Sequence, residues 1–101
     1  MQTQRISLVT LGVADLERSM AFYAALGWTP AETTDGAAFY RMEGMALALF
    51  GRAALAADQG RPGAALGTGA MTLAQNFADD AAVDAAIARA EAAGAAVLKR
   101  P

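Results

Sequence analysis

The sequence VTLGVADLERSMAFYAALGW at residues 9–28 determines how the first half of the chain folds. β-Branched residues at alternate positions are typical of a half-buried strand, here over residues 5–13. Asp15 then occupies the position of a helix N-cap, and apolar residues recur at helical spacing over residues 16–26. Gly27 follows where a left-handed C-terminal cap belongs. The stretch therefore predicts a strand, a capped helix of about three turns and a reversal.

Beyond this stretch the hydrophobic period changes to two, which favours short strands. Asp35-Gly36 and Glu43-Gly44 mark two tight reversals between the apolar runs. Pro30 lacks a backbone donor, which confines the first run to a sheet edge. The predicted antiparallel strands cover about residues 28–34, 37–42 and 45–50.

The first pattern returns after a connector. Residues 51–69 are rich in glycine and predict at most one helical turn, around residues 53–57. The second copy then contains a strand, an aspartate cap, a helix, a glycine and another strand. Its parts are a strand over residues 71–77, a cap at Asp79-Asp80, a helix face at Val83, Ile87 and Ala90, closure at Gly94 and a strand over residues 95–98.

Strand alternation sorts the side chains by face, because directly opposed residues share a side. A two-residue turn at Glu43-Gly44 predicts a bulky aliphatic face that forms the floor for the first helix. The opposite face has small alanines and is left to line a concavity. An even-length turn at Asp35-Gly36 places Glu32 on this concave face. A three-residue turn would place Glu32 on the other face. The floor comprises Val9, Leu11, Val13, Tyr40, Met42, Met45, Leu47 and Leu49, and the concave face comprises Phe39, Arg41, Ala46, Ala48 and Phe50.

Arg41 is the candidate ligand-binding group on the concave face. A lone guanidinium on an apolar surface suits the carboxylate or phosphate of a ligand. The competing interpretation is that Arg41 pairs with Glu32, which is diagonal to it. The other carboxylates occupy caps, turns and helix surfaces, where a structural role is favoured.

Composition excludes several classes of function. The 101 residues are 55% hydrophobic and 18% charged with a net charge of -2, which describes one globular domain. Without cysteine or histidine the chain lacks disulfides, a thiol nucleophile and the commonest metal ligand and general base. The basic residues are dispersed, so nucleic acid is not an expected partner. No apolar stretch approaches the ~20 residues that span a bilayer, and no signal peptide is found, so the expected location is the cytoplasm, without membrane association.

Residues 13–28 read V-x-D-L-x-x-S-x-x-F-Y-x-x-L-G-W and resemble the vicinal oxygen chelate superfamily, which includes glyoxalase I, the bleomycin and fosfomycin resistance proteins and the extradiol dioxygenases. Residues 83–95 resemble the second helix and glycine turn of that superfamily. The resemblance implies an α+β fold of paired βαβββ modules curved around a cleft, with the second module truncated. The implied single domain, residues 1–101, divides into a first module at 5–51, a connector at 52–69 and a partial second module at 70–101.

The resemblance also implies where a metal would be held in related enzymes. Those positions fall here at Leu8, at Ala48 and at Thr72, or at Gln75 if the strand has a bulge. Leu8 and Ala48 cannot bind a metal, and the closing segment with its final glutamate has no counterpart. We therefore expect no metal, no cofactor and no identifiable catalytic residue. Two expected strands are missing, which leaves an open sheet edge that favours a homodimer.

Three functions follow as hypotheses. The first is a metal-free protein that binds a small organic molecule, which can be anionic, in a cleft. The second is a lyase or dioxygenase whose metal ligands come from a second subunit or from residues outside this sequence. The third is a ferredoxin-like interaction module, which would have one four-stranded sheet and no fourth strand before the connector. The expected cleft comprises Leu8, Thr10, Glu32, Phe39, Arg41, Ala48, Phe50, Thr72 and Gln75.

Overall fold

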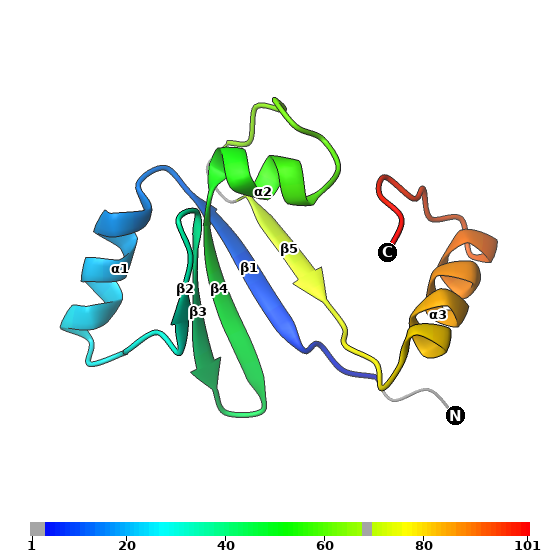
Figure 1. The fold of residues 1–101 in the computed structure, drawn as a ribbon, viewed down its shortest axis with the longest axis horizontal. Coiled ribbons are helices and arrows are strands. Elements are labelled where there is room, and N and C mark those ends of the chain that lie inside the picture. Colours follow the sequence, from blue (N-terminus) through cyan, green and yellow to red (C-terminus); the bar gives the residue numbers. More distant parts are fainter. Residues whose placement is uncertain (1–3, 68–69) are drawn as a thin grey trace.

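The computed structural model describes residues 4–67 and 70–101. Five strands form one mixed sheet in the order β2-β3-β4-β1-β5, in which β1 is parallel to β4 and antiparallel to β5 (Figure 1). This is the α+β class predicted for the chain. The elements are β1 (Leu8–Val13), α1 (Leu16–Ala25), β2 (Glu32–Thr33), β3 (Ala37–Met42), β4 (Met45–Gly51), α2 (Arg52–Asp58), β5 (Met71–Ala74) and α3 (Asp80–Ala92).

The predicted caps and turns of the first half are present. The Asp15 carboxylate accepts a hydrogen bond from the Arg18 backbone N–H at the start of α1. Gly27, with φ +88, ends that helix in the left-handed region. Met42 pairs with Met45, so the turn between β3 and β4 contains two residues, and Gly44 has φ +75 there.

The core lies between α1 and one face of the sheet. Tyr40 and Leu49 are fully buried there, and α1 packs Leu16, Met20 and Tyr23 against them. The floor predicted from strand alternation is therefore correct, because one register of the β3–β4 hairpin determines the side to which every residue of both strands points. Further members of this core are Ala38, Leu11, Val13, Met42 and Leu47.

The connector contains more structure than its sequence predicted. Instead of at most one turn, α2 extends over Arg52–Asp58 and buries Leu55 and Ala56 completely. It packs across the end of β1, where a Cβ at Gly12 would lie 2.8 Å from Leu55 Cδ2. Contact with the sheet therefore stabilises a helix that is too short to be stable alone.

The strand predicted over residues 28–34 is much shorter in the structure. The backbone N–H of Trp28 donates to Tyr23 O, and that of Gly27 donates to Ala24 O. These two bonds form a Schellman motif, which holds Trp28 against the helix end instead of the sheet. Only Glu32–Thr33 remain as β2, at the sheet edge that Pro30 predicted. The first strand likewise begins at Leu8 and not at residue 5.

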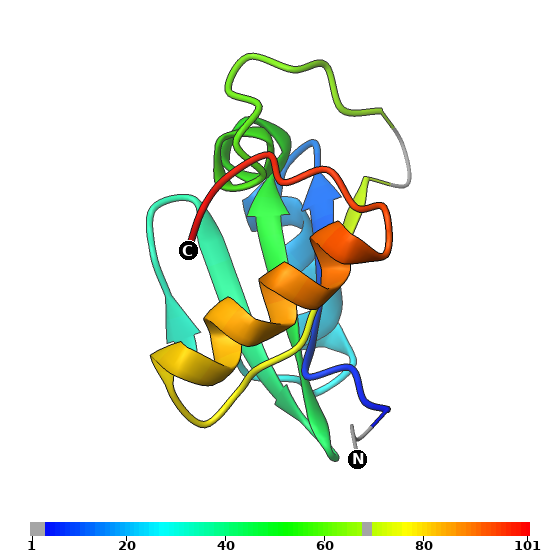
Figure 2. The same cartoon turned by 90° about the vertical axis from the view of Figure 1, so that its right-hand side faces the viewer.

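The second half departs further from expectation. β5 ends at Ala74 instead of residue 77, and residues 95–98 form no strand. A strand needs a neighbouring strand for its backbone groups, and residues 95–98 have none within the described ranges. The C-terminal segment returns instead toward α2, where Lys99 Nζ donates to Asp58 O (Figures 1 and 2).

The strand count contradicts the ferredoxin-like hypothesis. That fold has four strands in one sheet and no fourth strand before the connector, whereas β4 precedes the connector here and the sheet has five strands. None of the helices in the described part of the chain is long and apolar enough to cross a membrane.

Candidate functional site

The residues predicted for the cleft lie largely on one face of the sheet, the side turned away from α1, which we call the far face. In the sheet register Thr10 lies beside Ala48, and Ala48 lies beside Phe39. Leu8 and Arg41 lie on either side of Ala46 in the same way. Members of directly paired positions share a side, so three strands contribute to a single surface.

The centre of the far face is buried. Thr10 and Ala48 are buried, at 5% and 0% exposure. Phe39 and Phe50 meet edge to face on the same surface, with ring centroids 5.8 Å apart. The far face therefore has a buried centre and an aromatic surface formed by Phe39 and Phe50, which we call the aromatic wall.

Arg41 and Glu32 lie at one margin of this wall. Glu32 pairs with Phe39 in the register, which places it on the far face and diagonal to Arg41, as the even-length turn predicted. Both side chains are exposed, and within residues 4–67 and 70–101 no ion pair joins them. The arrangement leaves the Arg41 guanidinium available to an anionic ligand.

Thr72 lies at the other margin. Thr72 is directly opposite Thr10, and its hydroxyl accepts a hydrogen bond of 2.9 Å from Gln59 Nε2. Gln75 is exposed and follows the end of β5, which pairs with β1 without a bulge, so Thr72 and not Gln75 lies opposite Thr10. Sequence reasoning missed Gln59, because the connector that positions it was interpreted as largely irregular.

The positions that hold a metal in related enzymes do not fit a divalent cation here. Leu8 and Ala48 offer only hydrocarbon groups, and the Thr72 hydroxyl already bonds to Gln59. Among the described residues no three His, Cys, Asp or Glu side chains gather in one place. Divalent metals in proteins are bound by carboxylate, imidazole or thiolate groups, and Leu8, Ala48 and Thr72 supply none of these.

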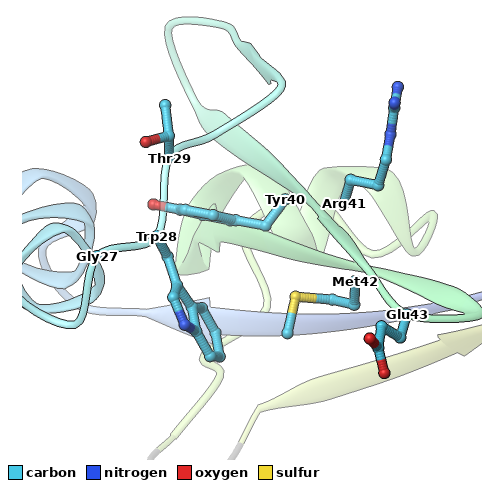
Figure 3. A pocket seen from close by; sticks show the side chains of 7 residues that line it. All are labelled: Gly27, Trp28, Thr29, Tyr40, Arg41, Met42 and Glu43. Atoms are coloured by element: carbon cyan, nitrogen blue, oxygen red, sulfur yellow. The ribbon is translucent and has the colours of Figure 1, made fainter.

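Two hollows flank the sheet, and each is lined in part by one residue predicted for the cleft, Thr72 in one and Arg41 in the other. A groove of about 610 Å³ lies between β5 and the C-terminal region and includes Thr72, Leu73, Ile87 and Leu98. A smaller pocket of about 360 Å³ lies beside the β3–β4 turn (Figure 3). Arg41 is among its lining residues, yet its guanidinium points away from the pocket.

Comparisons with known proteins place the chain in a family. The sequence profile of the Glyoxalase/Bleomycin resistance protein/Dioxygenase superfamily matches residues 5–101, and the chain belongs to this superfamily. A glyoxalase-related enzyme from Fulvimarina pelagi has a similar solved structure, with 35% sequence identity and a TM-score of 0.58. The similarity covers 91% of this chain and 66% of that chain, so this chain spans 66% of that enzyme's length. The search of curated proteins finds no match.

Proposed function

We propose that this protein binds a small organic anion on the far face without a metal. The observation that carries the proposal is Arg41, an exposed guanidinium with no ion pair among the described residues, beside the Phe39–Phe50 pair. A guanidinium binds a carboxylate or phosphate through two parallel hydrogen bonds. The two phenyl rings supply the apolar wall that most small-molecule sites contain.

The similarity to a glyoxalase-related enzyme supports a small metabolite as the ligand class, since that family member is itself described as an enzyme. Leu8, Ala48 and Thr72 do not supply metal ligands, so we assign metal-free binding to this surface. Metal analysis of the purified protein tests this part of the proposal. A stoichiometric transition metal would favour the lyase or dioxygenase hypothesis instead.

The binding test is isothermal titration against a panel of organic carboxylates, organic phosphates and uncharged analogues. We expect Arg41→Ala to weaken binding of an anion about tenfold or more, because a charge-assisted hydrogen bond is lost. Arg41→Lys should restore part of the affinity, since it keeps the charge and loses the two-pronged geometry. Arg18→Ala, an exposed arginine on α1, is the control. Equal affinity of all variants, or no binding by any compound, contradicts the proposal.

We also propose that a second copy of the chain pairs with the open edge of β5. Gly12 N–H donates to Ala70 O across the β1–β5 ladder, so the alternating pattern turns the backbone groups of Met71 and Leu73 toward the open edge. Their side chains are 53% and 54% exposed. The strand has no charged residue, and antiparallel pairing of two identical strands satisfies both edges at once.

Sedimentation velocity tests the pairing. Leu73→Lys should shift a dimer to monomer, because a lysine on an edge strand opposes strand addition. Phe22→Lys, which replaces an equally exposed apolar residue on α1, is the control and should leave the dimer intact. A wild-type monomer at all concentrations, or loss of the dimer in both variants alike, contradicts this interface.

A further inference from the structure

A pocket on the side of the sheet opposite the far face has no role in the proposed function. It lies between the segment that follows α1 and the end of the β3–β4 hairpin, with a volume of about 360 Å³ (Figure 3). That volume is within the range of sites for small organic molecules. Its lining residues are Gly27, Trp28, Thr29, Tyr40, Arg41, Met42 and Glu43.

Local structure positions Trp28 at this pocket. The Schellman motif at the end of α1 directs the Trp28 backbone back to Tyr23, and the two rings stack with centroids 5.0 Å apart at 14°. Tyr23 therefore occupies one face of the indole. The Trp28 side chain stays 37% exposed and lies across the pocket from the Met42 thioether (Figure 3).

Tyr40 brings an unsatisfied polar group to the pocket wall. The residue is 2% exposed, and its hydroxyl is buried without a hydrogen-bond partner. The ring points toward the segment that carries Trp28 and Thr29 (Figure 3). A buried hydroxyl without a partner costs free energy, which any group that pairs with it recovers. Burial and the neighbouring Tyr23 also raise the pKa of Tyr40 above its ordinary value, so the phenol is neutral at physiological pH.

Two charged residues line the pocket, and their side chains point apart. Glu43 lies on the same side as Trp28 and Met42, whereas the Arg41 guanidinium points to the opposite side of the strand (Figure 3). A carboxylate beside the faces and edges of aromatic rings repels anions and attracts cations. This selectivity is the reverse of the one proposed for the far face.

We propose that this pocket binds a small organic cation, a protonated amine with a flat apolar body. The ammonium donates to the Glu43 carboxylate, and the body packs on Trp28 and Met42. The Tyr40 hydroxyl is covered and lies beside the Trp28–Thr29 segment, away from Glu43, so the ammonium does not pair with it (Figure 3).

Trp28 is the single tryptophan of the chain and reports on the pocket by its fluorescence. The probe is phenethylamine, with phenethyl alcohol as the uncharged analogue and hydrocinnamate as the anionic one. We expect a saturable change with phenethylamine in the millimolar range, as is usual for so small a ligand. The alcohol should bind more weakly, and hydrocinnamate should give no saturable change.

Two conservative variants separate the contributions. Glu43→Gln should weaken phenethylamine binding about tenfold by removing the charge-assisted bond. Asp84→Asn removes the same charge from α3 and should bind phenethylamine like the wild type. That result would show that the change in net charge does not by itself cause the loss of affinity in Glu43→Gln.

Three outcomes would overturn the inference: no saturable change with phenethylamine, equal binding of hydrocinnamate, or an unchanged affinity in Glu43→Gln. Circular dichroism of each variant verifies that it is folded. The test is independent of the far-face proposal, because the probe carries the opposite charge and the variants lie on the other side of the sheet.

Discussion

The two halves of this chain begin with the same local pattern and differ in how they pack. In the first half Asp15 caps α1 by accepting from the Arg18 N–H, and in the second half Asp79 caps α3 by accepting from the Ala82 N–H. Yet α1 packs Leu16, Met20 and Tyr23 against the core, and α3 contributes no residue to that core and has no fully buried side chain.

The difference lies in the sheet that each helix meets. α1 packs on three hydrogen-bonded strands, β1, β4 and β3, whereas α3 crosses in front of the opposite face of the sheet without packing closely on it (Figures 1 and 2). A capped helix forms from local signals, but its apolar stripe is stabilised only by a surface of matching width. The comparison teaches that equal local patterns do not imply equal stability.

The largest expected effect is the loss of a core side chain in the first half. Leu49→Ala should lower the free energy of unfolding by about 2–5 kcal/mol, because Leu49 is fully buried beneath α1. Ile87→Ala in α3 should cost less than about 1 kcal/mol, since Ile87 is only half-buried. Urea unfolding followed by circular dichroism measures both. Similar losses in the two variants would show that the halves are packed alike.

Crowding of the contact between the connector helix and the sheet should have the next largest effect. A Cβ at Gly12 would lie 2.8 Å from Leu55 Cδ2 and 3.0 Å from Ala70 Cβ, so Gly12→Ala should cost about 1–3 kcal/mol. Gly67→Ala is the control, because a Cβ there meets nothing within 4 Å. Thermal unfolding distinguishes them, and an equally small effect in both would mean that α2 does not pack on β1.

Removal of the two helix caps sharpens the comparison further. Asp15→Ala should lower the global free energy of unfolding by about 1 kcal/mol, because α1 unfolds together with the core. Asp79→Ala should leave that free energy nearly unchanged and speed amide hydrogen exchange within α3 alone. Exchange measured segment by segment gives both results. If Asp79→Ala lowers global stability as much as Asp15→Ala, the second half folds cooperatively with the first.

The smallest expected effect concerns alkaline pH. The pKa of Tyr40 is raised by burial and by Tyr23, so its stabilising contribution is complete below the unfolded value near about 10. That contribution is lost as pH rises through the higher folded value. Between about pH 9 and about pH 11, wild-type stability should therefore fall more than that of Tyr40→Phe in urea titrations. If the free energies of unfolding of the wild type and of Tyr40→Phe fall equally with pH, the buried environment assigned to Tyr40 is contradicted.

Most of the first half could be predicted because its signals are local. The glycine at position 44 permits a two-residue turn, and that turn determines the side of every residue in β3 and β4. Placement of Arg41 and Phe39 on the far face followed from the same alternation. The ligand at this face stays a prediction, since the exposed margin around Arg41 is compatible with many anions.

The remainder of the candidate sites could not be predicted, because their residues meet through space. No spacing in the sequence indicates that Gln59 bonds to Thr72, or that Tyr40 lies next to Trp28 without a partner for its hydroxyl. Both contacts depend on how α2 and the segment after α1 pack on the sheet. A periodicity argument assigns a side chain to a face and does not identify its neighbour.

The amino-acid sequence alone determined the superfamily resemblance, the caps, the turns and the two faces of the first hairpin, because each depends on residues close together in the chain. Tertiary structure alone decided that α2 would form, that residues 95–98 would not become a strand, and that a pocket would open beside Trp28. These outcomes depend on which surfaces are present to be buried, and burial is a property of the whole folded chain.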